Sequence, residues 1–141
     1  MYVIPATVFR CSVSHHKQAT NRTFNAIFGK VGRAASAEVM IQMFNSKCLS
    51  ILYYGIDVCP LTNTQINSLQ FVINSCYSKI FVIKSNDDIR YCQDVFGCLP
   101  IADVVERRIA KFLKKYEEAN DNDNNNNNII IIKSIYIAQS R

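Results

Sequence analysis

The sequence contains few of the residues that make tight turns, and it lacks the long apolar run of a membrane span. Its 141 residues include only 4 Gly and 3 Pro and no Trp, a composition that disfavours a sandwich of short strands joined by many turns. No apolar stretch approaches the ~20 residues that cross a bilayer. No positive charge precedes the apolar residues 1–9, so we expect no signal peptide and an intracellular protein, cytoplasmic or nuclear.

Acidic residues are missing from the first quarter of the chain. Residues 1–33 contain five Lys and Arg and no Asp or Glu, so this segment alone accounts for the formal net charge of +5. A basic segment without acids favours a polyanionic partner, nucleic acid before a membrane surface.

Motifs that bind metals are missing too. The six cysteines include no CxxC pair, and the only histidines, His15 and His16, are adjacent and point in different directions on a helix. Six cysteines also allow three disulfides. Because we expect no secretion signal, we predict reduced cysteines that mostly act as small core residues.

Apolar residues recur with the period of an α-helix through most of the chain. We predict an all-α fold, a small bundle of four or five helices over residues 14–118. This domain follows an N-terminal segment at 1–13 and precedes a disordered, Asn-rich low-complexity tail at 119–141.

Start and stop signals divide the domain into helices. Ser14 is the expected N-cap of the first helix, and Thr62 with Gln65 has the spacing of a capping box at the third. The run at residues 81–83 is compatible with a short strand, but it is too short to decide between strand and helix. The remaining helices are expected from Ser36 to Gly55, from Asn86 to Gly97 and from Pro100 onward, the last with Val105, Ile109, Phe112 and Tyr116 facing inward.

The composition changes abruptly after Asn120. A polar run at 121–128 ends in five consecutive Asn and is followed by the Ile run at 129–132. A repeated AAT triplet encodes Asn, and the same repeat read one base later encodes Ile. We therefore favour a translated microsatellite without a selected function over an ordinary linker followed by an edge strand.

No arrangement typical of an enzyme emerges. A polymerase needs carboxylates that converge on two metal ions, whereas the adjacent acids Asp87 and Asp88 have the setting of a helix start. Residues 28–32 lack the spacing of a phosphate-binding loop, and nothing marks out one cysteine as a nucleophile. We expect no catalytic residue, no metal and no cofactor in this chain.

Two of the expected helices carry basic residues on one face, at about 100° per residue. Such stripes can neutralise phosphates without reading sequence, although each is also compatible with an ordinary solvated helix face. The first stripe is Arg22, Lys30 and Arg33, opposite the apolar residues of the first helix; the second is Arg107, Lys111 and Lys114 on the fifth helix, with Arg108 and Lys115 alongside.

A series of short segments between residues 22 and 116 follows a recognisable order. They are 24–32 (FNAIFGKVG), 46–55 (SKCLSILYYG), 60–61 (PL), 69–74 (LQFVIN), 79–81 (KIF), 91–100 (YCQDVFGCLP), 106–108 (ERR) and 111–113 (KFL). In this order and spacing, they resemble the region just after the catalytic palm in reverse transcriptases of animal non-LTR (LINE-like) retrotransposons.

The resemblance implies a thumb-like helical region that holds the RNA template and growing DNA strand in the whole enzyme. The palm with its metal-binding aspartates, the fingers, any endonuclease domain and a cysteine/histidine knuckle have no counterpart here, and Mg²⁺ would belong to the parent enzyme only. We therefore interpret the chain as a fragment of an RNA-directed DNA polymerase, without catalysis of its own. It would bind the backbone of a nucleic-acid duplex weakly and self-associate through the apolar surface that the palm would cover. The alternative is a small helical module that binds nucleic acid or a protein.

Overall fold

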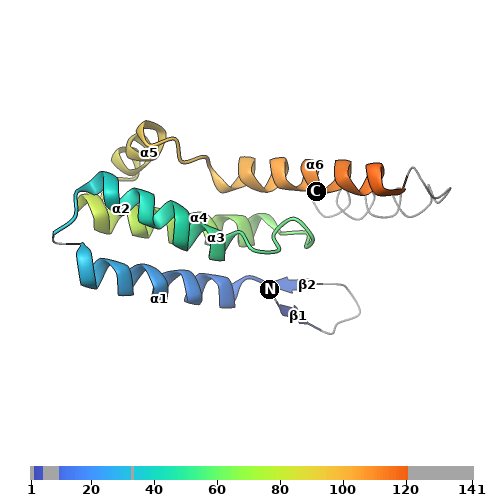
Figure 1. The fold of residues 1–141 in the computed structure, drawn as a ribbon, viewed down its shortest axis with the longest axis horizontal. Helices are drawn as coiled ribbons and strands as arrows, with labels where there is room; N and C mark the ends of the chain where they lie inside the picture. Colours follow the sequence, from blue (N-terminus) through green and yellow to red (C-terminus); the bar gives the residue numbers. More distant parts are fainter. Residues whose placement is uncertain (1, 5–9, 33, 121–141) are drawn as a thin grey trace.

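A computed structural model describes residues 2–4, 10–32 and 34–120 of the chain. Within these ranges, helices form a small bundle preceded by one antiparallel pair of short strands (Figure 1). The predicted all-α bundle is confirmed; the strands fall in the N-terminal segment, for which we predicted no element. In chain order the elements are β1 (Tyr2–Ile4), β2 (Arg10–Ser12), α1 (Ser14–Val31), α2 (Ala37–Met43), η1 (Phe44–Cys48), α3 (Leu49–Leu52), α4 (Asn63–Phe81), α5 (Asn86–Val95) and α6 (Ile101–Asn120).

The second expected helix is interrupted by a π-helical turn. The elements α2, η1 and α3 follow one another without a break, and the Leu49 N–H donates to the carbonyl of Phe44, five residues earlier. The described residues therefore form five helical segments, as predicted. The last of them, α6, continues through Asn120, two residues into the expected tail, while the rest of that tail lies outside the described residues.

The helix ends follow local sequence signals closely. The Gln65 N–H donates to Thr62 Oγ1 (3.3 Å) and the Thr62 N–H to Gln65 Oε1 (3.0 Å), which confirms the capping box. Gly55 and Gly97 adopt the left-handed φ values of 69° and 65° at the ends of their helical segments, a conformation that Gly reaches without a Cβ clash. Ser14 is the first residue of α1 instead of its cap, a position that Val13 occupies.

Residues 81–83 end a helix and form no strand. Phe81 is the last residue of α4, and Val82 has left-handed backbone angles (φ 57°, ψ 40°). The N–H groups of Val82 and Ile83 both donate to the carbonyl of Ser78, and the Ser78 hydroxyl in turn donates to the Ile83 carbonyl. These bonds satisfy backbone groups that the end of α4 would otherwise leave unpaired.

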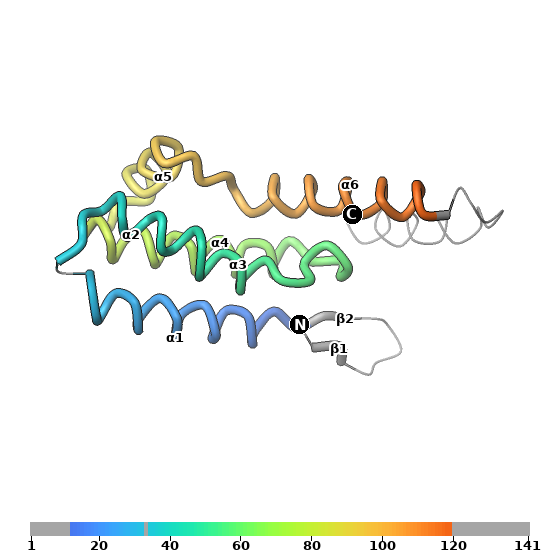
Figure 2. The backbone as a smooth tube through the Cα atoms, viewed as in Figure 1, coloured from blue at the N-terminus to red at the C-terminus, as the bar shows by residue number. Residues whose placement is uncertain are grey.

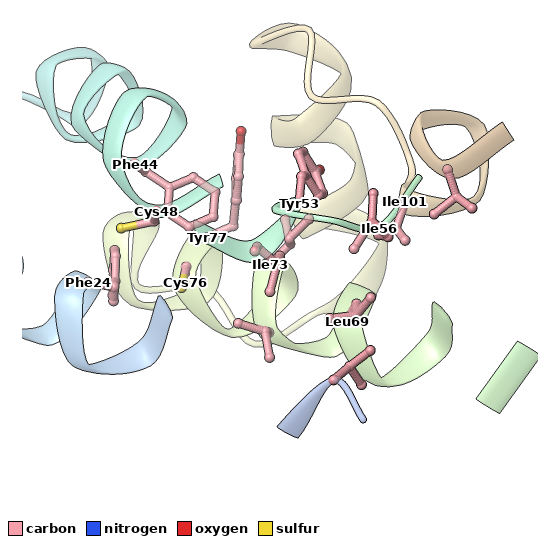
Figure 3. Close-up of a cluster of buried hydrophobic side chains, with 14 of the residues drawn as sticks. Phe24, Phe44, Cys48, Tyr53, Ile56, Leu69, Ile73, Cys76, Tyr77 and Ile101 are labelled. Atoms are coloured by element: carbon pink, nitrogen blue, oxygen red, sulfur yellow. The ribbon is translucent and has the colours of Figure 1, made fainter. Parts of the chain in front are cut away.

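Helix α4 is the centre of the bundle. It contacts α1, α2, α5 and α6, and Figures 1 and 2 show α1 on one side of the α2–α4 pair and α6 on the other. The core between them is aromatic and aliphatic (Figure 3), and the Phe44 ring lies edge-on to both Phe24 and Tyr77. Edge-to-face pairs of this kind add to the free energy gained by burying the rings. The labelled core residues are Phe24, Phe44, Cys48, Tyr53, Ile56, Leu69, Ile73, Cys76, Tyr77 and Ile101.

The second half of α6 departs from the expected inward face. Val105 is buried and Ile109 packs against the core, as predicted, and Ile101 is buried as well, but Phe112 and Tyr116 do not belong to the core cluster. Their half-buried rings stack on each other instead, with centroids 6.3 Å apart. These two residues lie outside the core because α6 is long and its second half runs past the end of the α3–α4 connection (Figures 1 and 2).

The cysteines are divided between free thiols and a disulfide. Cys48 and Cys76 are free and buried, and Cys92 and Cys98 are free and half-buried. Cys59 is disulfide-bonded, so the prediction of reduced cysteines is wrong at this position. The spacing of cysteines along the chain carries no information about which of them meet in space, and this is why the sequence could not reveal the bond.

Candidate nucleic-acid interface

The exposed face of α1 carries the first basic stripe. His16, Thr20 and Phe24 bury one side of this helix, and the side chains of Arg22 and Lys30 are exposed on the rest of its circumference. Arg33, the third residue expected here, lies outside the described residues.

Small residues leave the helix surface beside these cations open. Ala26 is exposed, and a Cβ added to Gly29 would meet no atom within 4 Å. A broad ligand such as a phosphate backbone can therefore approach the helix closely between Arg22 and Lys30. Residues 1–33 contain no acid that would oppose it.

A further cation reaches this helix from α4 and was missed by sequence reasoning. The Lys79 ammonium donates to Asn25 Oδ1 (3.0 Å) and lies 5.9 Å from the centroid of the Phe24 ring. Its side chain is nevertheless exposed, so the amide and the ring hold the charge at the edge of α1 without hiding it. No local pattern links residues 54 positions apart, and so no sequence signal could have found this pair.

The other lysine of α1 has a structural role. The Lys17 ammonium donates to Ser68 Oγ at 2.6 Å, which ties α1 to α4. On the same helix the imidazole Nδ1 of His16 lies 2.9 Å from the carbonyl oxygen of Ile51, which ties α1 to α3. These two bonds hold α1 so that Arg22 and Lys30 face solvent.

The second stripe lies along α6. Arg107, Lys111 and Lys114 are all exposed and lie on the side of the helix away from Val105. The Lys114 ammonium is 3.9 Å from the Glu118 carboxylate, with both side chains mostly exposed. Solvent and salt screen such a pair, so Lys114 remains able to bind a phosphate.

Arg108, expected alongside this stripe, turns toward the bundle instead. Its Nη1 donates to the Tyr53 carbonyl (3.4 Å), and its guanidinium carbon lies 5.2 Å from the centroid of the Tyr53 ring. Burial, more than any neighbouring charge, raises the pKa of the Tyr53 hydroxyl far above its usual range. The tyrosine therefore stays neutral, and Arg108 acts as the anchor between α6 and the end of α3.

The two stripes do not form one surface. Helix α4 contacts both α1 and α6, and those two helices lie on opposite sides of the α2–α4 pair (Figure 1). Each stripe faces away from the core that its helix packs on, so the stripes face away from each other. A straight duplex can contact only one of them at a time.

The adjacent acids of α5 and the two fully buried thiols are placed as helix-start and core residues. Asp87 and Asp88 are exposed in the first turn of α5, the helix start that their setting predicted. No three His, Cys, Asp or Glu side chains within residues 2–4, 10–32 and 34–120 are placed to hold a metal ion. Burial raises the pKa of the Cys48 thiol to about 11 and that of Cys76 to about 12, which leaves both without the thiolate that a nucleophile needs.

Comparison with known proteins yields no relative for this chain. It matches no protein-family model, no curated protein and no solved structure. None of the helices in the described ranges combines the length and the apolar character that crossing a membrane requires.

Proposed function

We propose that this chain is a fragment of a retrotransposon RNA-directed DNA polymerase, a thumb-like region that holds template–primer nucleic acid by its phosphate backbone. The observation that carries the proposal is the exposed pair Arg22 and Lys30 beside the open surface at Gly29. The resemblance of residues 22–116 to the post-palm region of non-LTR reverse transcriptases supports it, because the matching segments fall in α1, η1, α3, α4, α5 and α6, although none falls in α2.

The chemistry of α1 favours phosphates over bases as the ligand. Arg22 and Lys30 of α1, with Lys79 at its edge from α4, provide exposed positive charge, and each phosphate that they neutralise releases a condensed counterion. Contacts of this kind position a protein on a duplex and carry no sequence information. The proposed binding is weak and independent of sequence.

Salt dependence tests this proposal most directly. Three phosphate contacts predict a slope of about −3 in a plot of log affinity against log salt for an RNA–DNA duplex. Replacing both Arg22 and Lys30 by Gln should flatten that slope by about two units, because two contacts are lost. Lys84→Gln, which removes an exposed lysine between α4 and α5, is the matched control and should leave the slope unchanged. Equal slopes for the wild type and the Arg22/Lys30 double variant would contradict the assignment.

Because the stripes face opposite ways, α6 needs its own test. Replacing Arg107 and Lys111 by Gln removes two exposed cations and should change the slope independently of the α1 double variant. If only the α6 variant changes duplex binding, the interface lies on α6 and the role of α1 is excluded.

The proposed fragment catalyses no polymerisation. Within residues 2–4, 10–32 and 34–120, no three His, Cys, Asp or Glu side chains are placed to hold a metal ion, whereas the palm of the parent enzyme supplies metal-binding aspartates, and only there would Mg²⁺ take part. Purified protein given a primed template, dNTPs and Mg²⁺ should extend no primer. Extension that is abolished by Asp87→Ala or Asp88→Ala would show that the chain has its own active centre.

A small helical interaction module is the second candidate function. Exposed rings favour it, since Tyr54 and Phe71 are 73% and 72% exposed, and apolar surface of this kind is suited to a protein partner or to self-association. The flanking genomic sequence separates the two candidates. An upstream palm-coding remnant with stops or frameshifts supports the fragment, whereas a promoter and intact splice signals support the module.

A further inference from the structure

A groove between α4 and α5, which Pro100 and Ala102 at the start of α6 also line, plays no part in the phosphate binding proposed above. Its volume is about 700 Å³, within the range of about 300–1,000 Å³ typical of small-ligand sites. Both helices line it with one face. Helix α4 contributes Ile66, Asn67, Gln70, Phe71 and Asn74, and α5 contributes Asn86, Ile89, Arg90, Gln93 and Asp94.

A chain of carboxamides forms the polar wall of this groove. Asn74 Oδ1 accepts hydrogen bonds from Gln70 Nε2 (3.0 Å) and Gln93 Nε2 (2.8 Å), and Gln70 Oε1 accepts one from the backbone N–H of Ile101 (2.9 Å). These bonds hold the side chains in one orientation before any ligand arrives.

The wall keeps hydrogen-bonding capacity for a ligand. Its bonds use only the oxygen of Asn74, so the two N–H groups of that amide stay available, as does the Oε1 of Gln93. Gln93 is 7% exposed, and a carboxamide so deeply buried costs free energy unless its polar atoms find partners. The side-chain amides of Asn67 and Asn86 make no hydrogen bond to another residue that the structure describes.

The apolar wall contains an aromatic ring that the fold leaves uncovered. Phe71 is 72% exposed where it lines the groove, although most of the surface of a Phe is usually buried. An exposed ring beside fixed amide donors and acceptors matches the two requirements of a heterocyclic base, a surface for stacking and partners for its polar edge.

The charge of the groove suits an uncharged ring. Arg90 and Asp94 are its two charged lining residues, and their charges offset each other, so the groove offers little attraction to a phosphate. We propose that it binds an unpaired nucleobase of a single strand. The base stacks on Phe71 and its edge bonds to the amides of Asn67, Asn74 and Gln93, while the phosphates remain outside. The inference rests on the proposed function only in taking nucleic acid as the ligand.

A single-stranded oligo(dA) that contains a fluorescent adenine analogue tests this site, because stacking quenches the fluorophore. Phe71→Ala should weaken binding roughly 5- to 150-fold, the range found when a stacking aromatic is removed. Because Phe71 is mostly exposed, its removal should leave the circular dichroism spectrum unchanged. Tyr91→Ala is the matched control, since Tyr91 is 70% exposed on α5 and does not line the groove; it should bind like the wild type.

Each other outcome overturns the base-binding site. The first is that the wild type does not quench the fluorescence of the adenine analogue. The second is that the Phe71 and Tyr91 variants lose the same binding affinity. The third is that the chain binds a neutral peptide through Phe71 but does not bind the oligonucleotide. Duplex binding by the same variants separates this site from the phosphate-binding face. Phe71→Ala should leave the duplex salt slope unchanged, and the Arg22/Lys30 double variant should retain base-dependent quenching. If only quenching fails, the base site is wrong; if only the salt slope fails, the phosphate-binding face is wrong.

Discussion

Val82 is held in a backbone conformation that favours glycine, and replacing it should stabilise the protein. Its φ of 57° and ψ of 40° place it in the left-handed region at the end of α4. For a residue with a Cβ this conformation costs roughly 1–2 kcal/mol. The side chain is 89% exposed, so Val82→Gly removes almost no buried apolar surface.

The expected gain is the strain relieved less the entropy that glycine adds to the unfolded chain. That entropic cost is about 0.5–1 kcal/mol relative to alanine. The net change in the free energy of unfolding is therefore about 0.75 kcal/mol in favour of the variant, which for a domain of this size raises the melting temperature by about 2–4 °C.

Two further variants make the measurement specific. Asn tolerates the left-handed conformation better than other non-glycine residues, so Val82→Asn should fall between Gly and Val. Val82→Ala keeps the Cβ and should gain little. Thermal and urea unfolding report the free energy, and the m-value should stay constant because the folded surface does not change. Destabilisation by Val82→Gly, or equal gains from Gly and Ala, would refute an origin in backbone strain.

Two other predictions concern buried groups. Thr20 is fully buried and its hydroxyl has no hydrogen-bond partner among the described residues, so the isosteric Thr20→Val should raise the free energy of unfolding by about 1 kcal/mol. Thr23→Val is the control for helix propensity, because Thr23 is half-exposed on the same helix. A loss of stability in Thr20→Val would mean that the Thr20 hydroxyl is bonded. Burial raises the pKa of the Cys48 and Cys76 thiols from 9.0 to about 11 and about 12. Above pH 9 the thiols therefore lose their protons in the unfolded chain and keep them in the folded chain. The free energy of unfolding should fall with rising pH until the folded thiols also lose their protons, at about pH 11–12. Chemical unfolding across this window should show a shallower decline in Cys76→Ala than in the wild type, and equal declines would show that this thiol contributes nothing.

Local features of the fold could be predicted from the sequence, and contacts between distant segments could not. The capping box of Thr62 and Gln65 needs only residues three apart, and the left-handed Gly55 needs only its own lack of a Cβ. Periodicity also identified the buried face of α1. By contrast, the inward prediction for Phe112 and Tyr116 was wrong, because a periodic pattern does not show where neighbouring helices end.

The candidate site divides in the same way. The exposure of Arg22 and Lys30 follows from the position of Phe24 on the same helix, so the sequence sufficed for it. The pair Lys79–Asn25, the anchor Arg108–Tyr53 and the bond between Gln93 and Asn74 join residues from different helices. Their partners are brought together by the packing of whole helices, about which spacing along the chain says nothing.

The π-helical turn η1 makes the length of the α2–α3 segment critical. A π turn holds one residue more than an α turn, so losing or gaining a residue between Met43 and Leu49 would rotate α3 relative to α2. Leu52 and Tyr53 would then leave their buried positions. Arg108 of α6 would lose its contacts with the carbonyl and the ring of Tyr53. Point substitutions along this segment leave the chain length intact, whereas deletion of a single residue there would leave α6 held to the bundle mainly by its contacts with α4.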